Sequence, residues 1–211
     1  MNRIILILLL ALFSCKNKSK KIPDNDGNKL DTPIEVVTKI EFAPFPAWGT
    51  VGTEIKETSE TYLGESVYLI SRNKELTESS YAHTRSIFVE YEMTYRASVI
   101  VKKAENGSLF GLRIMGVYPD RVDAVFNLED GTVKGVQKTR DFESENATIE
   151  ELGDGWYKCI VSAVVVADDA KIFLGPTKGN ENVNGWTIRT PDNCDIYVLP
   201  SSLTLEKVSI E

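Results

Sequence analysis

Short runs of alternating apolar and polar residues follow one another from Ile34 to the end of the chain. In residues 156–166, Tyr157, Cys159, Val161 and Ala163 share one side, as in a strand with one buried face. Trp156 and Tyr157 lie on opposite faces, so at most one of them is predicted to lie in the core. The pattern predicts strands over residues 35–42, 48–57, 66–71, 84–91, 95–103, 109–117, 124–128, 132–136, 147–152, 156–166, 170–174, 195–199 and 203–208.

Glycine-containing turns separate many of these runs. Asp130-Gly131 lies between two strand patterns and is typical of a hairpin, and Gly153-Asp154-Gly155 leads into residues 156–166. Asn106-Gly107 predicts another hairpin, into residues 109–117. Sustained helical spacing is missing, and the best helical candidate, residues 72–79, is polar. We therefore expect an all-β fold, a two-sheet antiparallel β-sandwich of the jelly-roll type, over residues 34–211.

The first 33 residues differ from the rest. Residues 4–13 are all apolar and follow Arg3, but ten residues are too few to span a bilayer, so residues 1–14 are predicted to be a signal peptide. The run 12–15, Leu-Phe-Ser-Cys, resembles a bacterial lipobox, which implies an acyl anchor on Cys15; the alternative is an ordinary signal peptide with an incidental cysteine. Residues 15–33 are rich in Lys, Asn and Asp and are predicted to form a flexible tether. The expected location is the bacterial cell envelope, lipid-anchored to the outer membrane on its periplasmic or surface side.

Composition narrows the class of partner. The 211 residues carry a net charge of −7, which argues against nucleic acid as a ligand, since nucleic-acid binding needs a basic surface. Apart from Cys15, the chain holds Cys159 and Cys194. In an exported protein these two can form a disulfide, but the buried face of Cys159 favours a thiol packed as a small apolar group.

Two segments support a family resemblance. Residues 127–133, Asn-Leu-Glu-Asp-Gly-Thr-Val, and residues 147–159, which end in Gly-Asp-Gly-Trp-Tyr-Lys-Cys, resemble a pattern of jelly-roll carbohydrate-binding modules. The pattern is also similar to β-sandwich domains of phage tail-fibre and head-spike proteins. The likeness extends from about Phe45 onward and implies the sandwich fold with a glycan ligand. The chain departs from the family in its closing strand, where Pro200 interrupts the expected ladder.

Sugar binding on such a fold needs exposed aromatic faces and a few fixed polar groups. Trp48, Tyr81, Tyr118 and Trp186 lie in or beside polar, loop-like segments. Packing in the core is the preferred interpretation for Trp48. Trp186 has two open interpretations, because its side chain can anchor the loop or bind a ligand together with Arg189.

Arg113 lies on the opposite strand face from Phe110, Leu112 and Ile114. A charge at the centre of a strand must face a solvated cleft or have a partner, and an exposed arginine on the convex surface is the alternative. We consider Arg113 a candidate residue for orienting a ligand.

His83, the single histidine, shares one strand face with Tyr81 and Arg85. Such a row can bind an acidic sugar, or it can act in β-elimination with Tyr81 or His83 moving the proton. A solvated surface is the simpler interpretation. No catalytic residue is assigned.

No cofactor is expected apart from a structural calcium, which the resemblance implies between the first and last strands. Glu41, Asp192 and Asp195 are the candidate oxygen ligands.

The leading hypothesis is a lipid-anchored glycan-binding module whose candidate site residues are Trp186, Arg189, Arg113, Trp48, Tyr81 and His83. One alternative is a small polysaccharide lyase or glycoside hydrolase on the same fold. The other is a structural or adhesion module whose partners are other envelope proteins.

Overall fold

The computed structural model describes residues 34–42, 45–72, 79–178, 182–188 and 193–210. These ranges contain strands and two short 3₁₀ turns, η1 (Phe45–Ala47) and η2 (Val183–Gly185). The strands are β1 (Ile34–Glu41), β2 (Gly49–Val51), β3 (Thr53–Tyr62), β4 (Glu65–Arg72), β5 (Tyr81–His83), β6 (Ile87–Phe88), β7 (Met93–Lys103), β8 (Leu109–Met115), β9 (Arg121–Asn127), β10 (Thr132–Thr139), β11 (Glu143–Gly153), β12 (Trp156–Val165), β13 (Asp169–Thr177) and β14 (Asp195–Ile210).

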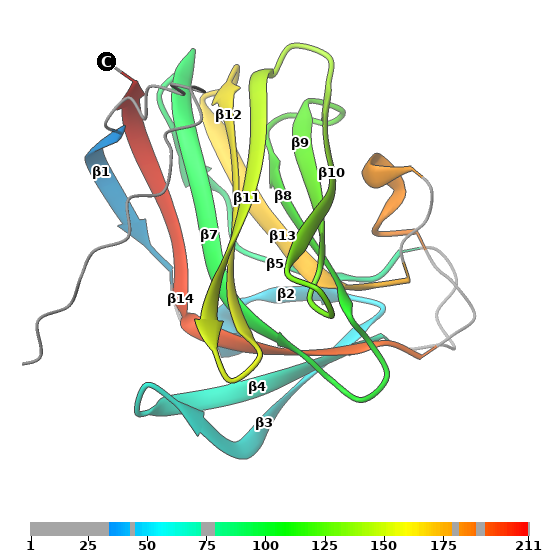
Figure 1. Cartoon of the computed structure of the whole chain (residues 1–211). Helices are drawn as coiled ribbons and strands as arrows, with labels where there is room; N and C mark the ends of the chain where they lie inside the picture. Colours follow the sequence, from blue (N-terminus) through cyan, green and yellow to red (C-terminus); the bar gives the residue numbers. More distant parts are fainter. Residues whose placement is uncertain (1–33, 43–44, 73–78, 179–181, 189–192, 211) are drawn as a thin grey trace, which may run out of the picture. The chain divides into compact units, whose positions relative to one another are not determined.

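Two antiparallel sheets make the sandwich (Figure 1). The first sheet has the order β11-β12-β7-β14-β4-β3, with β1 also paired to β14. The second sheet has the order β10-β9-β8-β13-β5-β2, with β6 also paired to β13. The predicted all-β sandwich is confirmed.

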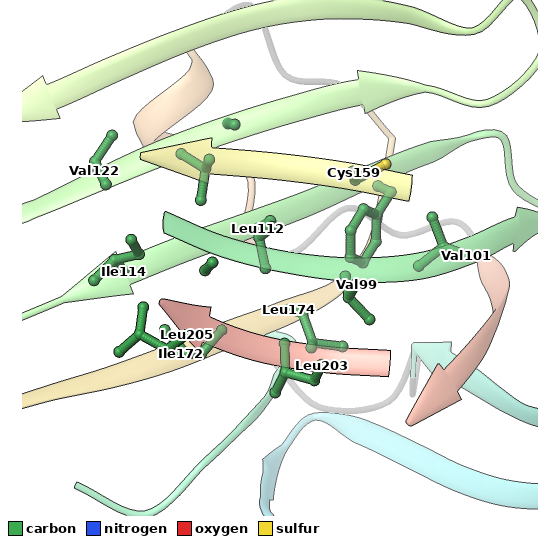
Figure 2. Close-up of a cluster of buried hydrophobic side chains, with 14 of the residues drawn as sticks. Val99, Val101, Leu112, Ile114, Val122, Cys159, Ile172, Leu174, Leu203 and Leu205 are labelled. Atoms are coloured by element: carbon green, nitrogen blue, oxygen red, sulfur yellow. The ribbon is translucent and has the colours of Figure 1, made fainter. Parts of the chain in front are cut away.

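The main core lies between the two sheets. Alternate residues of β7, β12 and β14 face alternate residues of β8, β9 and β13. Figure 2 shows this contact, with Val99, Val101, Cys159, Leu203 and Leu205 from the first sheet and Leu112, Ile114, Val122, Ile172 and Leu174 from the second. Each of these side chains is at most 2% exposed. Burial of this apolar surface is the main term that stabilises the sandwich.

Two of the predicted hairpins form and one does not. Gly131 joins β9 to its partner β10 with φ +67°, and residues 153–155 join β11 to β12, all with positive φ. At Asn106-Gly107 the predicted turn forms, closed by a bridge between Ala104 and Gly107, but the predicted hairpin does not, because β7 belongs to the first sheet and β8 to the second. A turn sequence specifies a reversal of the chain, but it does not specify whether the next strand pairs with the previous one.

The predicted interruption at Pro200 is confirmed. The register between β14 and β7 shifts between Leu199 and Thr204. Ser202 occupies this bulge: its Oγ accepts a hydrogen bond from the Ile100 amide at 2.7 Å and donates one to the Leu199 carbonyl at 2.6 Å. The two strands predicted at 195–199 and 203–208 are therefore one strand, β14, with a bulge in the middle.

Some strands have other boundaries in the structure than those predicted from the sequence. The run 84–91 contains only the two-residue strand β6, and the strand before it, β5, was not predicted. Of the helical candidate at 72–79, Arg72 ends β4 and Ser79 forms an isolated bridge with Ile188, while residues 73–78 lie outside the described ranges.

The leader, Cys15 and the tether also lie outside the described residues. Residues 32–211 form a unit of their own, which contains the sandwich. Within the described ranges, no helix has the length and apolarity needed to cross a bilayer. Cys159 and Cys194 are both buried and are not joined by a disulfide.

Candidate functional site: a cleft on the outer face of the second sheet

A short segment covers part of the outer face of the second sheet. Residues 182–188 contain η2, drawn in orange at the right of Figure 1, and η2 contacts β9 and β10. The central residues of β8 and β9 are consequently buried on both faces. This covering segment turns one part of an otherwise exposed sheet into the floor of a cleft.

Trp186 fixes the covering segment to the sheet. Its indole is 0% exposed and packs with Val125 and Phe173. A Cβ atom at position 111 would overlap the indole ring, so Gly111 makes the close approach possible. The interpretation of Trp186 as a loop anchor is correct, and its assignment as a sugar-stacking residue is wrong, because no ring face is available to a ligand.

Arg72 holds the same segment from the first sheet. Its Nη2 donates to the carbonyl of Trp186 at 2.7 Å, and its Nη1 donates to that of Ile188 at 3.1 Å. Its Nε donates to the carbonyl of Pro176 at 3.0 Å. A third link is the Ser80 amide, which donates to the carbonyl of Thr187 at 2.8 Å. The covering segment is therefore anchored on both sides.

The charged centre of the site is Asp123, which is fully buried on β9. Its Oδ1 accepts from Arg113 Nε at 2.6 Å and from Trp186 Nε1 at 2.8 Å, and its Oδ2 accepts from Arg121 Nε at 3.0 Å. With its amide nitrogen directed at Asp123, Asn184 adds a bond to Oδ2 at 3.0 Å. Burial raises the pKa of Asp123, and the charge of Arg113 opposes that rise most strongly.

Arg113 thus has a partner and also lines the cleft described below, so the alternative of an exposed arginine on the convex surface is wrong. Its side chain is 8% exposed, and the guanidinium lies 5.8 Å from the ring centroid of Phe173 and 5.5 Å from that of Trp186. Burial lowers the pKa of Arg113, while the carboxylate of Asp123 acts in the opposite direction. Arg113 is first a structural residue, and only its outer nitrogen is left for a ligand.

These residues surround a cleft of about 320 Å³, which we call the outer cleft. It is lined by Ser79, Tyr81, Arg113, Met115, Tyr118, Arg121, Phe173, Asn184, Thr187 and Ile188. Tyr118 is 73% exposed, and the guanidinium of Arg121 lies 5.7 Å from its ring centroid. Tyr118 therefore offers a ring to a ligand, with a cation beside it.

Tyr81 and His83 lie together on this face, as their strand parity predicts. Tyr81 lines the outer cleft and packs edge-on against Phe173 at 4.8 Å, while His83 stacks on Phe173 at 5.4 Å between ring centroids. His83 Nδ1 donates to the carbonyl of Thr84 at 2.9 Å, since a carbonyl oxygen only accepts. A Cβ at position 49 would overlap the imidazole, so Nε2 packs against Gly49. This arrangement gives no support to a lyase centre at His83.

The other candidates lie elsewhere. Trp48 is buried in the core, edge-on to Phe45 at 4.4 Å, as the core interpretation predicted, and it does not line the outer cleft. Arg189 and Asp192 lie outside the described residues.

The register of the first sheet places Glu41 and Asp195, two of the three candidate calcium ligands, far apart. Glu41 pairs with Thr204 of β14, and Thr204 in turn pairs with Ser98, so Glu41 lies at the level of Ser98 along β7. Asp195 lies one residue beyond the pair Ile196–Lys103, at the other end of β7. Six residues of β7 separate the two levels, about 20 Å at the rise of a strand. Across the ranges that the structure describes, no group of three or more His, Cys, Asp or Glu side chains could hold a metal ion.

A larger depression, about 540 Å³, lies beside the connection between β7 and β8. Three of its polar side chains already have protein partners: Lys103 pairs with Glu129 at 2.6 Å, and Asn106 donates to Asp195 at 3.1 Å. None of its described lining residues is aromatic. The outer cleft, although smaller, has the better chemistry for a sugar.

Asp123 and Arg121 were not identified from the sequence, and Tyr118 was not included among the candidate site residues. The predicted strand began at Ala124, whereas β9 begins at Arg121. With the correct boundary, Asp123 falls directly opposite Arg113 in the register. A charge pair at facing positions of adjacent strands is the signal that could have identified the centre.

No family model matches the sequence, and no curated protein matches it. The solved structures that are similar to it include three of sugar-binding or sugar-degrading proteins. One contains the CBM22-1 and GH10 modules of an endo-1,4-β-D-xylanase from Clostridium thermocellum with xylohexaose (TM-score 0.45, 14% identity, 82% of this chain and 28% of that chain). The second is a putative sugar binding protein from Bacteroides thetaiotaomicron (TM-score 0.39, 11% identity, 81% and 95%). The third is TmCBM27, a carbohydrate-binding module that recognises mannan (TM-score 0.37, 10% identity, 83% and 96%).

The chain therefore spans 28% of the length of the xylanase structure. With TM-scores below 0.5, these likenesses assign neither a family nor a ligand to this chain.

Proposed function

We propose that the protein is a non-catalytic glycan-binding module, lipid-anchored through Cys15 at the cell envelope, that binds saccharide in the outer cleft. The observation that carries this proposal is the pairing of an exposed aromatic ring, Tyr118, with polar groups fixed on a rigid sheet. Pyranose C–H groups pack against an aromatic face, while guanidinium, amide and hydroxyl groups bind the ring substituents.

The floor of the cleft is pre-organised. Arg113, Arg121, Trp186 and Asn184 all bond to Asp123, and the covering segment is also bonded to Arg72. A ligand therefore meets side chains that are already ordered, which lowers the entropic cost of binding. The tether would allow this cleft to reach polymer at a distance from the membrane.

The test is a glycan panel screened by affinity electrophoresis and titration with residues 16–211, which contain the tether and the whole sandwich. Tyr118→Ala is expected to weaken binding about tenfold, the loss of about 1.4 kcal/mol of stacking energy. The matched control is Tyr91→Ala, another exposed tyrosine (52%), which does not line the cleft.

Unchanged affinity in Tyr118→Ala would remove the outer cleft from the proposal. Absence of binding to every neutral and acidic glycan would contradict the function itself and would favour the adhesion alternative.

A further inference from the structure

The charge of the outer cleft is opposite to that of the chain. The chain has a net charge of −7, yet the cleft is lined by Arg113 and Arg121 and, among its described lining residues, by no aspartate or glutamate. Asp123 lies beneath these arginines and is 0% exposed. Two guanidinium groups against one buried carboxylate leave one positive charge in excess at the floor.

Both arginines also retain an uncommitted nitrogen. Arg113 uses Nε for Asp123 and Nη2 for the carbonyl of Asn184 at 3.1 Å, which leaves Nη1. Arg121 uses Nε for Asp123 and Nη1 for the carbonyl of Pro119 at 3.2 Å, which leaves Nη2. Neither remaining nitrogen has a protein partner among the described residues.

Both arginines reach the surface of the cleft. The side chain of Arg113 is 8% exposed and that of Arg121 is 14% exposed, and both residues line the outer cleft. A ligand can therefore use these donors without breaking an existing bond.

An anionic oxygen pair suits such donors. Hydrogen bonds between guanidinium and carboxylate are charge-assisted and are about twice as strong as neutral ones. Arginine is favoured over lysine where a planar acceptor must be oriented. The ring of Tyr118, with Arg121 beside it, adds a surface for a sugar ring next to the anion.

We infer that the outer cleft selects acidic saccharides, with a uronate carboxylate bound by Arg113 Nη1 and Arg121 Nη2 and the pyranose ring packed on Tyr118. This inference rests on the proposed function and adds to it the chemical class of the ligand. The carboxylate replaces water at two donors that the buried Asp123 does not use.

The test compares each acidic polymer with its own methyl ester, which keeps the sugar rings and removes the charge. Polygalacturonate, alginate and hyaluronate are titrated into residues 16–211 at low and high salt. At least one acidic polymer is expected to bind about tenfold more tightly than its ester, and added salt should reduce that difference. Because this comparison uses the unaltered chain, it does not depend on the folding of a variant.

Two variants locate the effect. Arg121→Gln is expected to reduce binding of the acidic polymer about tenfold more than it reduces binding of the ester, because only the acidic polymer loses a charge-assisted bond. Arg96→Gln removes the same charge from the outer face of the first sheet, where Arg96 pairs with Glu206, and should leave both affinities unchanged.

The outcomes separate this inference from the proposed function. If glycans bind but no acidic polymer exceeds its ester, the inference is overturned and the glycan-binding function stands. If poly-glutamate binds as tightly as the best acidic polymer, the cleft recognises anionic chains and the saccharide part is overturned. If no glycan of any charge binds, both fail.

Discussion

Each sheet carries a tryptophan and an arginine on its outer face, but the two faces use them differently. On the first sheet, Trp156 stacks on Tyr62 at 4.4 Å with Lys102 5.7 Å from its ring, and Arg96 directs both Nε and Nη2 at Glu206. On the second sheet, Trp186 covers a buried carboxylate shared by two arginines.

The difference between the faces lies in what remains for a ligand. On the first sheet, Trp156 packs against Tyr62 and Lys102, Arg96 pairs with Glu206, and Trp156 is only 3% exposed. The outer cleft has comparable burial at its floor, but among the described residues Arg113 Nη1 and Arg121 Nη2 have no protein partner and the ring of Tyr118 is exposed. Aromatic residues on a sheet thus do not by themselves identify a site, whereas unused donors beside an exposed ring do.

The largest effect is expected from removal of the shared acceptor on the second sheet. Asp123→Ala leaves Arg113 and Arg121 without their common partner and should lower the free energy of unfolding by about 3–5 kcal/mol. The matched change on the first sheet, Glu206→Ala, breaks a more exposed pair and should cost about 1 kcal/mol or less. Urea unfolding followed by circular dichroism measures both, and equal losses would contradict the contrast between the faces.

The next largest loss of stability is expected where the indole of Trp186 packs on Gly111. Gly111→Ala places a methyl group where the indole lies, so we expect a loss of about 1–3 kcal/mol and a change in tryptophan fluorescence. At Gly175 a Cβ would meet its nearest neighbour at 3.6 Å, an ordinary contact. Gly175→Ala should therefore change stability by about 0.5 kcal/mol or less, and a cost equal to that of Gly111→Ala would refute the proposed packing.

Substitution of two tyrosines is expected to separate effects on stability from effects on glycan binding. Tyr62→Ala removes the ring stacked on Trp156 and should cost about 1 kcal/mol without affecting glycan affinity. Tyr118→Ala should change stability by about 0.5 kcal/mol or less while weakening binding, because its ring is 73% exposed. Thermal unfolding and titration of both variants check this, and loss of binding in Tyr62→Ala would show that the first sheet takes part.

The smallest difference between variants is expected in the reactivity of Cys159, which lies in the core between the two sheets. Burial raises the pKa of Cys159 well above its ordinary value, so the folded state favours the neutral thiol. This contribution to stability is present below the pKa of the unfolded thiol and is lost as the pH rises toward that of the folded thiol. At pH 8 we expect Cys159 to resist alkylation in the unaltered chain and in Tyr118→Ala; labelling at the rate of the unfolded chain, read by mass spectrometry, would contradict a closed core.

The sequence predicts the fold better than the site because the fold signals are local. Asp130-Gly131 and residues 153–155 place positive-φ positions where paired strands reverse, and alternation marks the buried face of β12. Tyr157 lies in the main core and Trp156 on the opposite face, as expected, but Trp156 is also buried because Tyr62, far away in the sequence, covers it. Trp186 has polar neighbours in sequence, but Gly111 and Asp123 decide its burial. Such long-range contacts leave no periodic pattern in the sequence.

The most direct test of the account uses the three tryptophans, which report on three regions. Trp48 lies in the core, Trp156 on the outer face of the first sheet, and Trp186 beneath the outer cleft, with its indole N–H bonded to Asp123. In a ¹H–¹⁵N spectrum of the indole groups, titration with a bound glycan is expected to shift the signal of Trp186 and to leave those of Trp48 and Trp156 in place. A shift of Trp156 with Trp186 unmoved would contradict the assignment of the site to the second sheet.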